Sequence, residues 1–438
     1  MKKNSDILYK FIKVVIILLI SKTYINPEVL VFPPYGHSYG IRKATPKHLF
    51  LLLGPRTAFD NPEGLATVRL QSWEDTTKAG DDDEVVVYGV NSGRNQILYN
   101  TSMWTLGLYG DSGDSVGCFN APKGIAADSK GNVYVADSGN NRVVHLFNPK
   151  AKLGWKKAFY VKGDSDSGLK GPSRISFDER GNVYVNDPGN RRIVVFNQDG
   201  SVIRKISSNA EFSFEDGPTA LVVADGRAQW SYFDNERMIF CADKNGTRLW
   251  KLSLDGTVIK KVTVPSGYHV SYGAIDFYHN LWLTDTYNHC ILKFDHNLNF
   301  LDKFGSYGTG DNQFVEPRGI TIYKRFGQTF VAEKKGAQYY WIGTDLKQYE
   351  IKRNIDGKYD LTLNASEFSF LSLFSTHGTD TTFYVKKRRI YPGGCTVSVS
   401  DKESKIDLNT LMLKIEPTYS SYTYNAWFYP VQNRIIKK

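Results

Sequence analysis

Residues 121–147 read APKGIAADSKGNVYVADSGNNRVVHLF, and residues 171–196 repeat the pattern as GPSRISFDERGNVYVNDPGNRRIVVF. In the first copy, two short alternating apolar runs, Gly124–Ala127 and Val133–Ala136, are separated by the turn sequence Asp-Ser-Lys-Gly-Asn. A third run, Arg142–Phe147, comes after the turn Ser-Gly-Asn-Asn. Period-two alternation bounded by Gly, Asn and Asp is typical of antiparallel strands. Two copies this similar predict a repeated unit with a period of about 40–50 residues.

The units align on the residue that ends the second strand of each one. This residue is Asn91, Asp137, Asp187, Asp243, Asp285 and Glu333, and five positions later come Gln96, Arg142, Arg192, Arg248, Cys290 and Gln338. In three units the pair is Asp with Arg across a tight turn: Asp137 with Arg142, Asp187 with Arg192, and Asp243 with Arg248. Because a carboxylate and a guanidinium can pair bidentately at that spacing, we interpret these pairs as structural staples of hairpins.

An aromatic strand followed by a Gly/Asp turn lies between units, as in Leu108–Gly113 and Lys303–Gly308, and adds a fourth strand. Radial arrays of four-stranded sheets are β-propellers. The two copies quoted above resemble NHL repeats, and weaker copies begin GPTALVVADG, YGAIDFYHNLWLTD and QFVEPRGITIYKR. The resemblance spans residues 48–350 and implies a six-bladed β-propeller. Two insertions, Gln71–Glu84 and Gln229–Glu236, each fall between a first and a second strand, so we expect them on the same face.

The segments outside the repeats predict export and a second domain. Residues 1–23 begin with basic residues and continue into the apolar run Val14–Ile20, the pattern of a secretory signal peptide, with a short membrane-targeting segment as the alternative. Residues 24–47 are rich in Pro and Gly, as linkers are. Residues 355–438 alternate apolar and polar residues without a helical period, which predicts a small C-terminal β-sandwich-like domain. We therefore expect a secreted, periplasmic or cell-surface protein with no further transmembrane span.

The ring of blades is expected to close with both ends of the repeat region. The apolar segment His48–Leu53 matches the outermost-strand unit and is predicted to pair with the last blade near Tyr339–Ile342. Gln348–Lys352 is the competing segment for that place.

Residues at the entry to each first strand should border the central channel. They are Glu63, Lys123, Ser173, Thr219, Tyr272 and Arg318. Arg174 stands where other units have Gly or Ala, and His269 precedes Tyr272. The ligand-binding candidates are therefore Glu63, Lys123, Arg174, His269, Tyr272 and Arg318. This rim is mainly cationic, in a chain whose net charge is +10, and would favour an anionic group.

No cofactor or metal is expected from the sequence. The four cysteines, Cys118, Cys241, Cys290 and Cys395, lack regular spacing, so neither a disulfide framework nor a zinc site is encoded. Amidating lyases share the propeller fold and hold zinc with three inward-pointing histidines beside a Tyr and an Arg. Tyr272 and Arg318 resemble the last two, but only His269 is placed to face inward, and zinc needs three or four protein ligands.

The pattern as a whole favours an exported, non-catalytic module that binds a protein, peptide or glycan at the channel face. The alternative is a channel-sited lyase or hydrolase related to amidating lyases or lactonases. A basic platform with a stacking aromatic is also what RNA-binding propellers need, but the predicted export argues against nucleic acid as the partner.

Overall fold

The computed structural model describes most of the repeat region and a large part of the C-terminal region. The described residues are 30–31, 43–54, 57–73, 85–102, 105–150, 152–160, 168–208, 214, 217–225, 236–323, 327–344, 346–377, 380–400, 406, 408, 410–418 and 427–431. The predicted signal segment 1–23, most of the linker 24–47 and most of both insertions lie outside them. The chain forms two compact units, Tyr35–Trp341 and Met1–Pro34 with Ile342–Lys438. The all-β prediction is confirmed.

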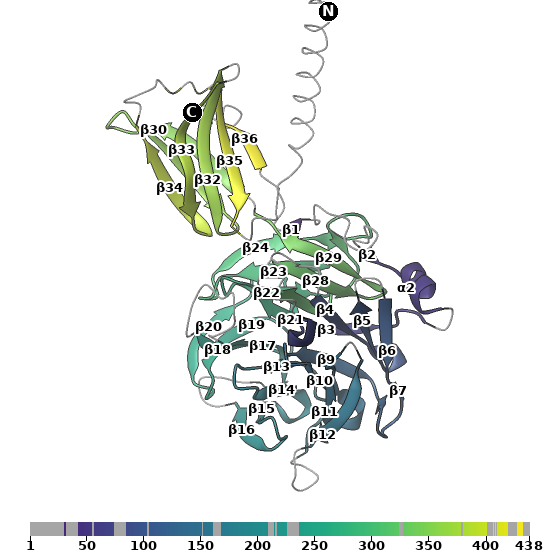
Figure 1. The fold of residues 1–438 in the computed structure, drawn as a ribbon. Coiled ribbons are helices and arrows are strands. Elements are labelled where there is room, and N and C mark those ends of the chain that lie inside the picture. Colours follow the sequence, from purple (N-terminus) through teal and green to yellow (C-terminus); the bar gives the residue numbers. More distant parts are fainter. Residues whose placement is uncertain are drawn as a thin grey trace, which may run out of the picture. The chain divides into compact units, whose positions relative to one another are not determined.

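The larger unit is built from four-stranded antiparallel sheets whose strands follow chain order (Figure 1). The first three sheets are β3–β6 (Pro62–Arg69, Val85–Asn91, Gln96–Ser102, Thr105–Tyr109), β9–β12 (Pro122–Ala127, Asn132–Asp137, Arg142–Phe147, Gly154–Phe159) and β13–β16 (Ile175–Phe177, Val183–Asp187, Arg192–Phe196, Val202–Ser207). The next two are β17–β20 (Pro218–Asp225, Arg237–Asp243, Arg248–Ser253, Val258–Thr263) and β21–β24 (Val270–Ile275, Leu281–Asp285, Cys290–Phe294, Phe300–Phe304). Another sheet joins β27 (Ile320–Tyr323), β28 (Gln328–Glu333) and β29 (Gly336–Ile342) to β2 (Lys43–Ala44).

Short elements complete the loops between these sheets. Two parallel strand pairs lie between a fourth strand and the next first strand: β7 and β8 (Asp111–Ser112, Cys118–Phe119), and β25 and β26 (Ser306–Tyr307, Gln313–Phe314). Single 3₁₀ turns are Gln71–Trp73, Ser92–Arg94, Ser138–Asn140 and Pro188–Asn190.

The first strands of the sheets contact one another in a closed cycle. β3 contacts β9, and the contacts continue through β13, β17, β21 and β27, which returns to β3. Glycine permits this close approach, since a Cβ on Gly64 would lie 2.7 Å from the Lys123 carbonyl oxygen. A Cβ on Gly124 would lie 2.7 Å from the carbonyl oxygen of Ser173. Antiparallel sheets packed side by side in this way form a β-propeller.

The apolar core of the propeller lies between successive sheets rather than at one centre. Val86 and Tyr88 of β4 belong to one buried cluster with Val133 of β10 and Val144 of β11. Further clusters join β9–β11 to β13–β15, and β17–β19 to β21–β23. Each sheet therefore depends on its neighbours to bury its faces, as expected for a repeat protein.

The prediction that His48–Leu53 is the outermost strand of the last sheet is wrong. Pro46–Leu53 forms the helix α2, with Pro46 at its first position and the Thr45 N–H bonded to His48 Nδ1 at 3.1 Å. Proline at the first helical position leaves no N–H unsatisfied, which favours a helix start there. The place beside β29 is taken instead by β2, in which Lys43 pairs with Gln338.

The smaller unit contains two sheets that share one apolar core. One sheet is β30 (Leu346–Arg353), β31 (Tyr359–Ala365) and β34 (Gly393–Val399). The other is β33 (Asp380–Ile390), β32 (Ser369–His377), β35 (Leu411–Pro417) and β36 (Trp427–Pro430), and this unit also includes β1 (Leu30–Val31). Leu361 and Leu363 of the first sheet are buried in one cluster with Leu371 and Leu413 of the second. The predicted propeller range was 48–350. Because β30 starts at Leu346, Gln348–Lys352 belongs to the smaller unit and not to the propeller.

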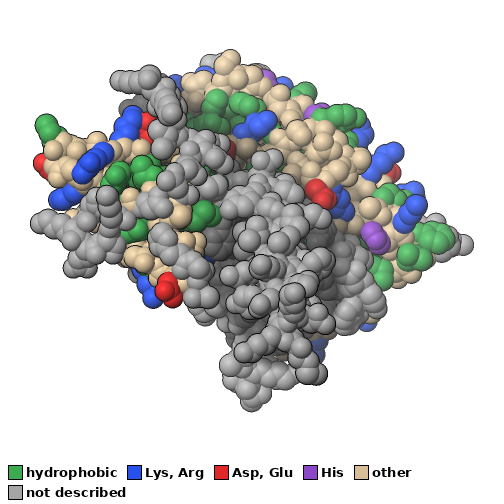
Figure 2. All heavy atoms as spheres, turned by 90° about the horizontal axis from the view of Figure 1, so that it is seen from above, with side chains coloured by type: hydrophobic (Ala, Val, Ile, Leu, Met, Phe, Trp, Pro, Cys, Tyr) green, Lys and Arg blue, Asp and Glu red, His purple; other side chains and the backbone are tan. Residues whose placement is uncertain are grey.

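The surface carries its positive charge in a dispersed form. Lys and Arg side chains are spread among polar and apolar ones over the described face in Figure 2. Within the described residues, no helix is long and apolar enough to cross a bilayer.

His145 makes the core of the second sheet sensitive to acid. The imidazole is only 2% exposed, stacks on the Tyr134 ring at 4.5 Å between centroids, and contacts Asn132 Oδ1 through Nε2 at 2.9 Å. Burial, reinforced by Lys156 and Lys157, lowers the pKa of His145 from 6.5 to about 4.

We expect stability to fall with pH through this histidine. Between pH 6.5 and about 4, His145 is protonated in the unfolded chain and stays neutral in the folded protein. The free energy of unfolding therefore decreases as pH falls through this range. The complete loss amounts to about 3 kcal/mol. Urea unfolding across this window should show a smaller decrease for His145→Gln than for the wild type. Parallel pH profiles for the two proteins would contradict the prediction.

A second prediction concerns the edge strand β2. Removing residues 1–44 uncovers the edge of β29, and an unpaired strand edge promotes association between chains. We expect the truncated protein to aggregate in size-exclusion chromatography, whereas removal of residues 1–29, which leaves β2 intact, should preserve the monomer fraction. Equal behaviour of the two truncations would show that residues 30–44, which contain β1 and β2, do not protect this edge.

Candidate functional site

The carboxylate at the end of each second strand organises the loops around it. Asp137 is fully buried, and its Oδ2 accepts hydrogen bonds from Arg142 Nε at 2.7 Å and Asn140 Nδ2 at 2.8 Å. Its Oδ1 accepts the backbone N–H of Asn120 at 2.7 Å. Asn120 lies just before the first strand of the same sheet, so this one side chain joins the hairpin turn to the entry of β9.

The Asp–Arg pairs are made through one nitrogen rather than bidentately. The remaining N–H groups of Arg142 donate to the backbone, with Nη1 to Asp114 O at 2.6 Å and Nη2 to Cys118 O at 2.9 Å. The guanidinium therefore binds the preceding loop as well as Asp137. This second role explains why an arginine, with its several fixed donors, occupies the position.

The same arrangement recurs in the third and fourth sheets. Asp187 accepts hydrogen bonds from Arg192 Nε at 2.7 Å and from the Lys170 N–H at 2.6 Å. Asp243 contacts Arg248 Nε at 3.0 Å but binds the Thr247 N–H instead of the loop before its own first strand. All three pairs thus stabilise hairpins, and Asp137 and Asp187 also bind the loop that enters their first strand.

The register of the first strands shows which residues face the rim. Pro62, Pro122 and Pro218 pair with the anchors Asn91, Asp137 and Asp243, so Glu63, Lys123 and Thr219 come next at equivalent positions. In the fifth sheet the residue paired with the anchor Asp285 is Val270. The rim position is therefore Ser271, and the sequence alignment misplaced Tyr272 by one residue.

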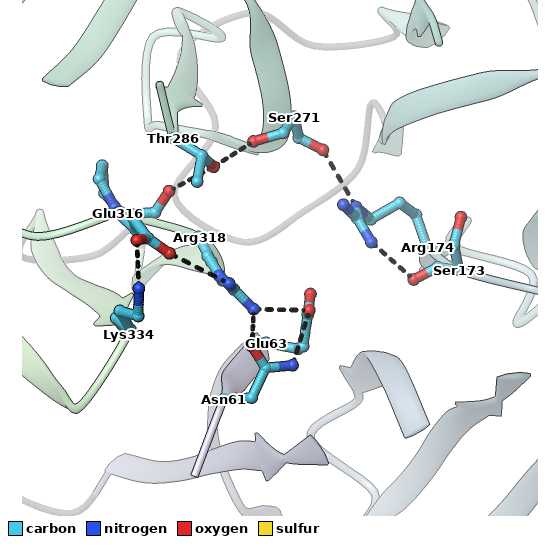
Figure 3. A network of polar contacts seen from close by, with 10 residues as sticks. Asn61, Glu63, Ser173, Arg174, Ser271, Thr286, Glu316, Arg318 and Lys334 are labelled. Carbon is cyan, nitrogen blue, oxygen red and sulfur yellow. Dashed lines mark hydrogen bonds and ion pairs between the residues drawn. The ribbon is translucent and has the colours of Figure 1, made fainter. Parts of the chain in front are cut away.

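Tyr272 instead shares a position with Arg174, and the two side chains meet. The equivalent residues in the other sheets are small: Gly64, Gly124, Ala220 and Gly319. The Arg174 Cζ lies 3.3 Å from the centroid of the Tyr272 ring, well within cation–π range. Arg174 Nε donates to the Ser271 carbonyl at 3.0 Å and Nη1 to the Ser173 carbonyl at 3.1 Å (Figure 3).

Arg318 is held by carboxylates on the other side of the rim. Its Nη1 donates to Glu63 Oε1 at 2.9 Å and to Asn61 Oδ1, and its Nη2 lies 3.4 Å from Glu316 Oε2 (Figure 3). Glu316 also binds Lys334 at 2.6 Å. Of the predicted rim cations, Arg318 is thus paired with the predicted Glu63, and Glu316 is shared between Arg318 and Lys334.

Burial and neighbouring charges act together on Arg174. Desolvation lowers its pKa from 12.5 to about 10, Glu63 opposes that change, and Arg318 adds to it. Arg174 stays protonated at neutral pH but is a desolvated cation. The Tyr272 hydroxyl is buried and has no hydrogen-bond partner among the described residues. Arg174 is thus the group of this pair with a donor, Nη2, that has no acceptor among the described residues.

The remaining two candidates do not join this cluster. Lys123 holds its rim position in β9, but no contact among the described residues links its ammonium group to Arg174 or Arg318. The His269 ring contacts the Asn245 carbonyl through Nδ1 at 2.8 Å and lies edge-on to Tyr287. His269 therefore belongs to the outer loops, where its N–H binds the anchor Asp285 at 2.7 Å.

Sequence reasoning missed the residues that link the two halves of the rim. Thr286 Oγ1 donates to the Pro317 carbonyl at 2.8 Å and contacts Ser271 Oγ at 3.0 Å (Figure 3). Counting back 14 positions from Asp285, the spacing of Lys123 from Asp137 and of Ser173 from Asp187, would have placed Ser271 at the rim. In the described part of the chain, no group of three or more His, Cys, Asp or Glu side chains is placed to hold a metal ion.

The comparisons with known proteins agree with the repeat pattern. The family model for the NHL repeat matches residues 119–146. The chain contains an NHL repeat at these residues. The resemblance seen in the sequence is thereby confirmed for the stretch that contains β9, β10 and most of β11.

Several solved structures are similar at low identity. A catalytically inactive virginiamycin B lyase from Staphylococcus aureus with quinupristin has 14% identity over 60% of this chain and 78% of its own, with a TM-score of 0.43. A gluconolactonase from Xanthomonas campestris has 11% identity over 72% of this chain and 98% of its own, with a TM-score of 0.45. Such values transfer no activity to this NHL-repeat protein. No curated protein is similar to the chain in sequence.

The anchor carboxylate gives a direct prediction for stability. Asp137→Ala removes three hydrogen bonds and leaves the buried Arg142 without its counter-charge. We expect a loss of about 2–4 kcal/mol in the free energy of unfolding. Asp199→Ala, at an exposed hairpin tip, serves as the control and should change stability little. An Asp137→Ala variant that unfolds in guanidinium chloride as the wild type does would refute the structural role.

Proposed function

We propose that this NHL-repeat protein is an exported six-bladed propeller with a C-terminal β-sandwich, and that it binds an anionic group of a protein, peptide or glycan at its rim without catalysis. The blades would be the sheets that begin with β3, β9, β13, β17, β21 and β27. Export is inferred from the sequence pattern of residues 1–23.

The observation that supports binding most is the stack of Arg174 on Tyr272. The fold does not require these side chains, because Gly64, Gly124 and Gly319 occupy the same position elsewhere. A desolvated guanidinium is costly to maintain, as its lowered pKa indicates. A group that costs folding energy and is not needed for packing is typical of a functional site.

The chemistry of the site favours a carboxylate or a similar anion. Arg174 uses Nε and Nη1 for backbone carbonyls, so within the described part of the chain Nη2 has no acceptor. The Tyr272 ring lies beneath the same guanidinium and holds it in place. An anionic oxygen would satisfy Nη2 and would also relieve the desolvation of Arg174.

The decisive experiment compares charged and neutral ligands on one variant. We expect calorimetry to show binding of a poly-glutamate peptide or of oligogalacturonate, weakening as added salt screens the charge, and none of poly-glutamine or neutral galacto-oligosaccharide. Arg174→Gln should weaken binding at least about tenfold. Its melting temperature should be equal to or above that of the wild type, because a desolvated cation is removed.

Arg180→Gln is the matched control, since Arg180 is exposed in the same blade at the opposite end of β13. Binding of both acidic probes that is insensitive to Arg174→Gln, or no binding of either, would overturn the proposal. Consumption of a probe by the protein would favour the alternative, a channel-sited lyase or hydrolase.

A further inference from the structure

The fifth sheet presents an exposed tyrosine where other sheets have glycine. Tyr287 comes directly after Thr286 in the turn between β22 and β23 and is 80% exposed. The equivalent turn residues in the first three sheets are Gly93, Gly139 and Gly189. The hairpin therefore forms without a side chain at this position, and packing does not explain the large ring.

A second exposed tyrosine lies in the loop after β24. Tyr307 in β25 is 69% exposed, and its ring lies 4.8 Å from that of His289, in the same turn as Tyr287. The His269 ring lies 5.7 Å from the Tyr287 ring in an edge-on contact. Each tyrosine thus has a histidine beside it and leaves most of its surface open to solvent.

The turn that bears Tyr287 is rigid. Asp285 Oδ1 accepts the N–H groups of Tyr287 and Asn288 at 3.0 and 2.9 Å. The Asn288 side chain donates to the Gly267 carbonyl at 2.7 Å. A fixed backbone reduces the entropy lost when the aromatic side chain binds a ligand, which is a property of preorganised sites.

Residues next to both tyrosines are hydrogen-bonded to the rim. Thr286, the neighbour of Tyr287, contacts Ser271, whose carbonyl binds Arg174. On the other side, His289 Nδ1 accepts the N–H of Glu316, and Glu316 contacts Arg318. The turn that carries Tyr287 and His289 is therefore linked to Arg174 through Thr286 and to Arg318 through Glu316.

We propose that the ligand is an acidic polysaccharide, with Tyr287 and Tyr307 stacking on its sugar rings while Arg174 binds a uronate carboxylate. This inference rests on the proposed function and adds the class of ligand. A tyrosine ring offers a flat apolar face with a polar edge, which matches a pyranose ring that has an apolar C–H face and hydroxyls at its rim. Asn288 and the two histidines supply hydrogen-bonding groups beside the rings.

Other ligands with the same charge fit the surface less well. Stacked nucleotides need a cationic track for their phosphates, and no Lys or Arg among the described residues stacks on Tyr287 or Tyr307, whose ring neighbours are histidines. Peptide hot spots favour aromatic anchors in fully desolvated pockets, whereas both tyrosines are mostly exposed. Exposed aromatic faces beside polar groups favour sugar rings.

The test uses oligogalacturonate and a poly-glutamate peptide on the full chain. We expect Tyr287→Ala and Tyr307→Ala each to weaken oligogalacturonate binding about five- to tenfold and to leave poly-glutamate binding unchanged. Tyr287→Phe should retain most of the affinity, because stacking needs the ring and not the hydroxyl. Tyr391→Ala, at a 55% exposed tyrosine of the smaller unit, is the control.

The outcomes separate this inference from the proposed function. Oligogalacturonate binding that is lost in Arg174→Gln but unchanged in both alanine variants overturns the role of the tyrosines alone. Binding of poly-glutamate without oligogalacturonate overturns the glycan and keeps the anionic site, and binding of neither overturns both. If oligo-thymidine binds in place of the glycan and depends on the tyrosines, Tyr287 and Tyr307 form a nucleic-acid site and the glycan proposal is wrong. Equal melting temperatures confirm that each variant is folded.

Discussion

The propeller depends on a hydrogen bond that the strand-ending anchor accepts from an N–H of the preceding loop, which five of its sheets contain. It joins Asn91 to Asp60, Asp137 to Asn120 and Glu333 to Val315, each at 2.7 Å. Because the loop leads directly into the first strand, the bond fixes where that strand begins. The start of the first strand in turn decides which residues border the rim. A buried acceptor left without this donor would be costly, and each anchor, whether Asn, Asp or Glu, has a side-chain oxygen that can accept the bond.

The residues of the proposed site, Arg174 and Tyr272, stand at a position where the other sheets have a small side chain. Close packing of first strands explains the glycines, since a Cβ on Gly124 would meet the backbone of the next sheet at 2.7 Å. Arg174 extends past Ala220 of the fourth sheet and reaches the Ser271 carbonyl of the fifth. The fold thus supplies backbone carbonyls that Arg174 binds, and the ligand site that we propose lies where Arg174 and Tyr272 replace the small residues of the repeat.

The sequence predicted the parts of the structure that repeat and failed where local signals compete. The anchors, their arginines and the four-strand unit could be predicted from residues that recur with the same chemistry. Tyr272 was misplaced by one position because the segment before it has no proline to mark the strand entry. The apolar residues of α2 resemble a strand, and the Thr45-Pro46 start was the overlooked signal. In the structure Arg318 contacts Glu63 and Glu316, and Glu316 also contacts Lys334. Spacing along the sequence alone does not reveal these contacts.

The fifth sheet departs from the repeat in ways that cost stability. His279 occupies the turn position of Gly131 and Gly181 and adopts φ 58°, a left-handed conformation that disfavours side chains with a Cβ. Its Nδ1 lies 2.7 Å from Glu236 Oε2, and the same carboxylate binds Lys251, which lowers the pKa of Glu236. This contact offsets the backbone strain by joining the fourth and fifth sheets. The strained turn follows one end of β21, and the Arg174 cation stacks on Tyr272 near the other end. Such features persist only where the surrounding structure supports them. The contacts of Glu236 with Lys251 and His279 therefore support β21 at the end opposite Tyr272.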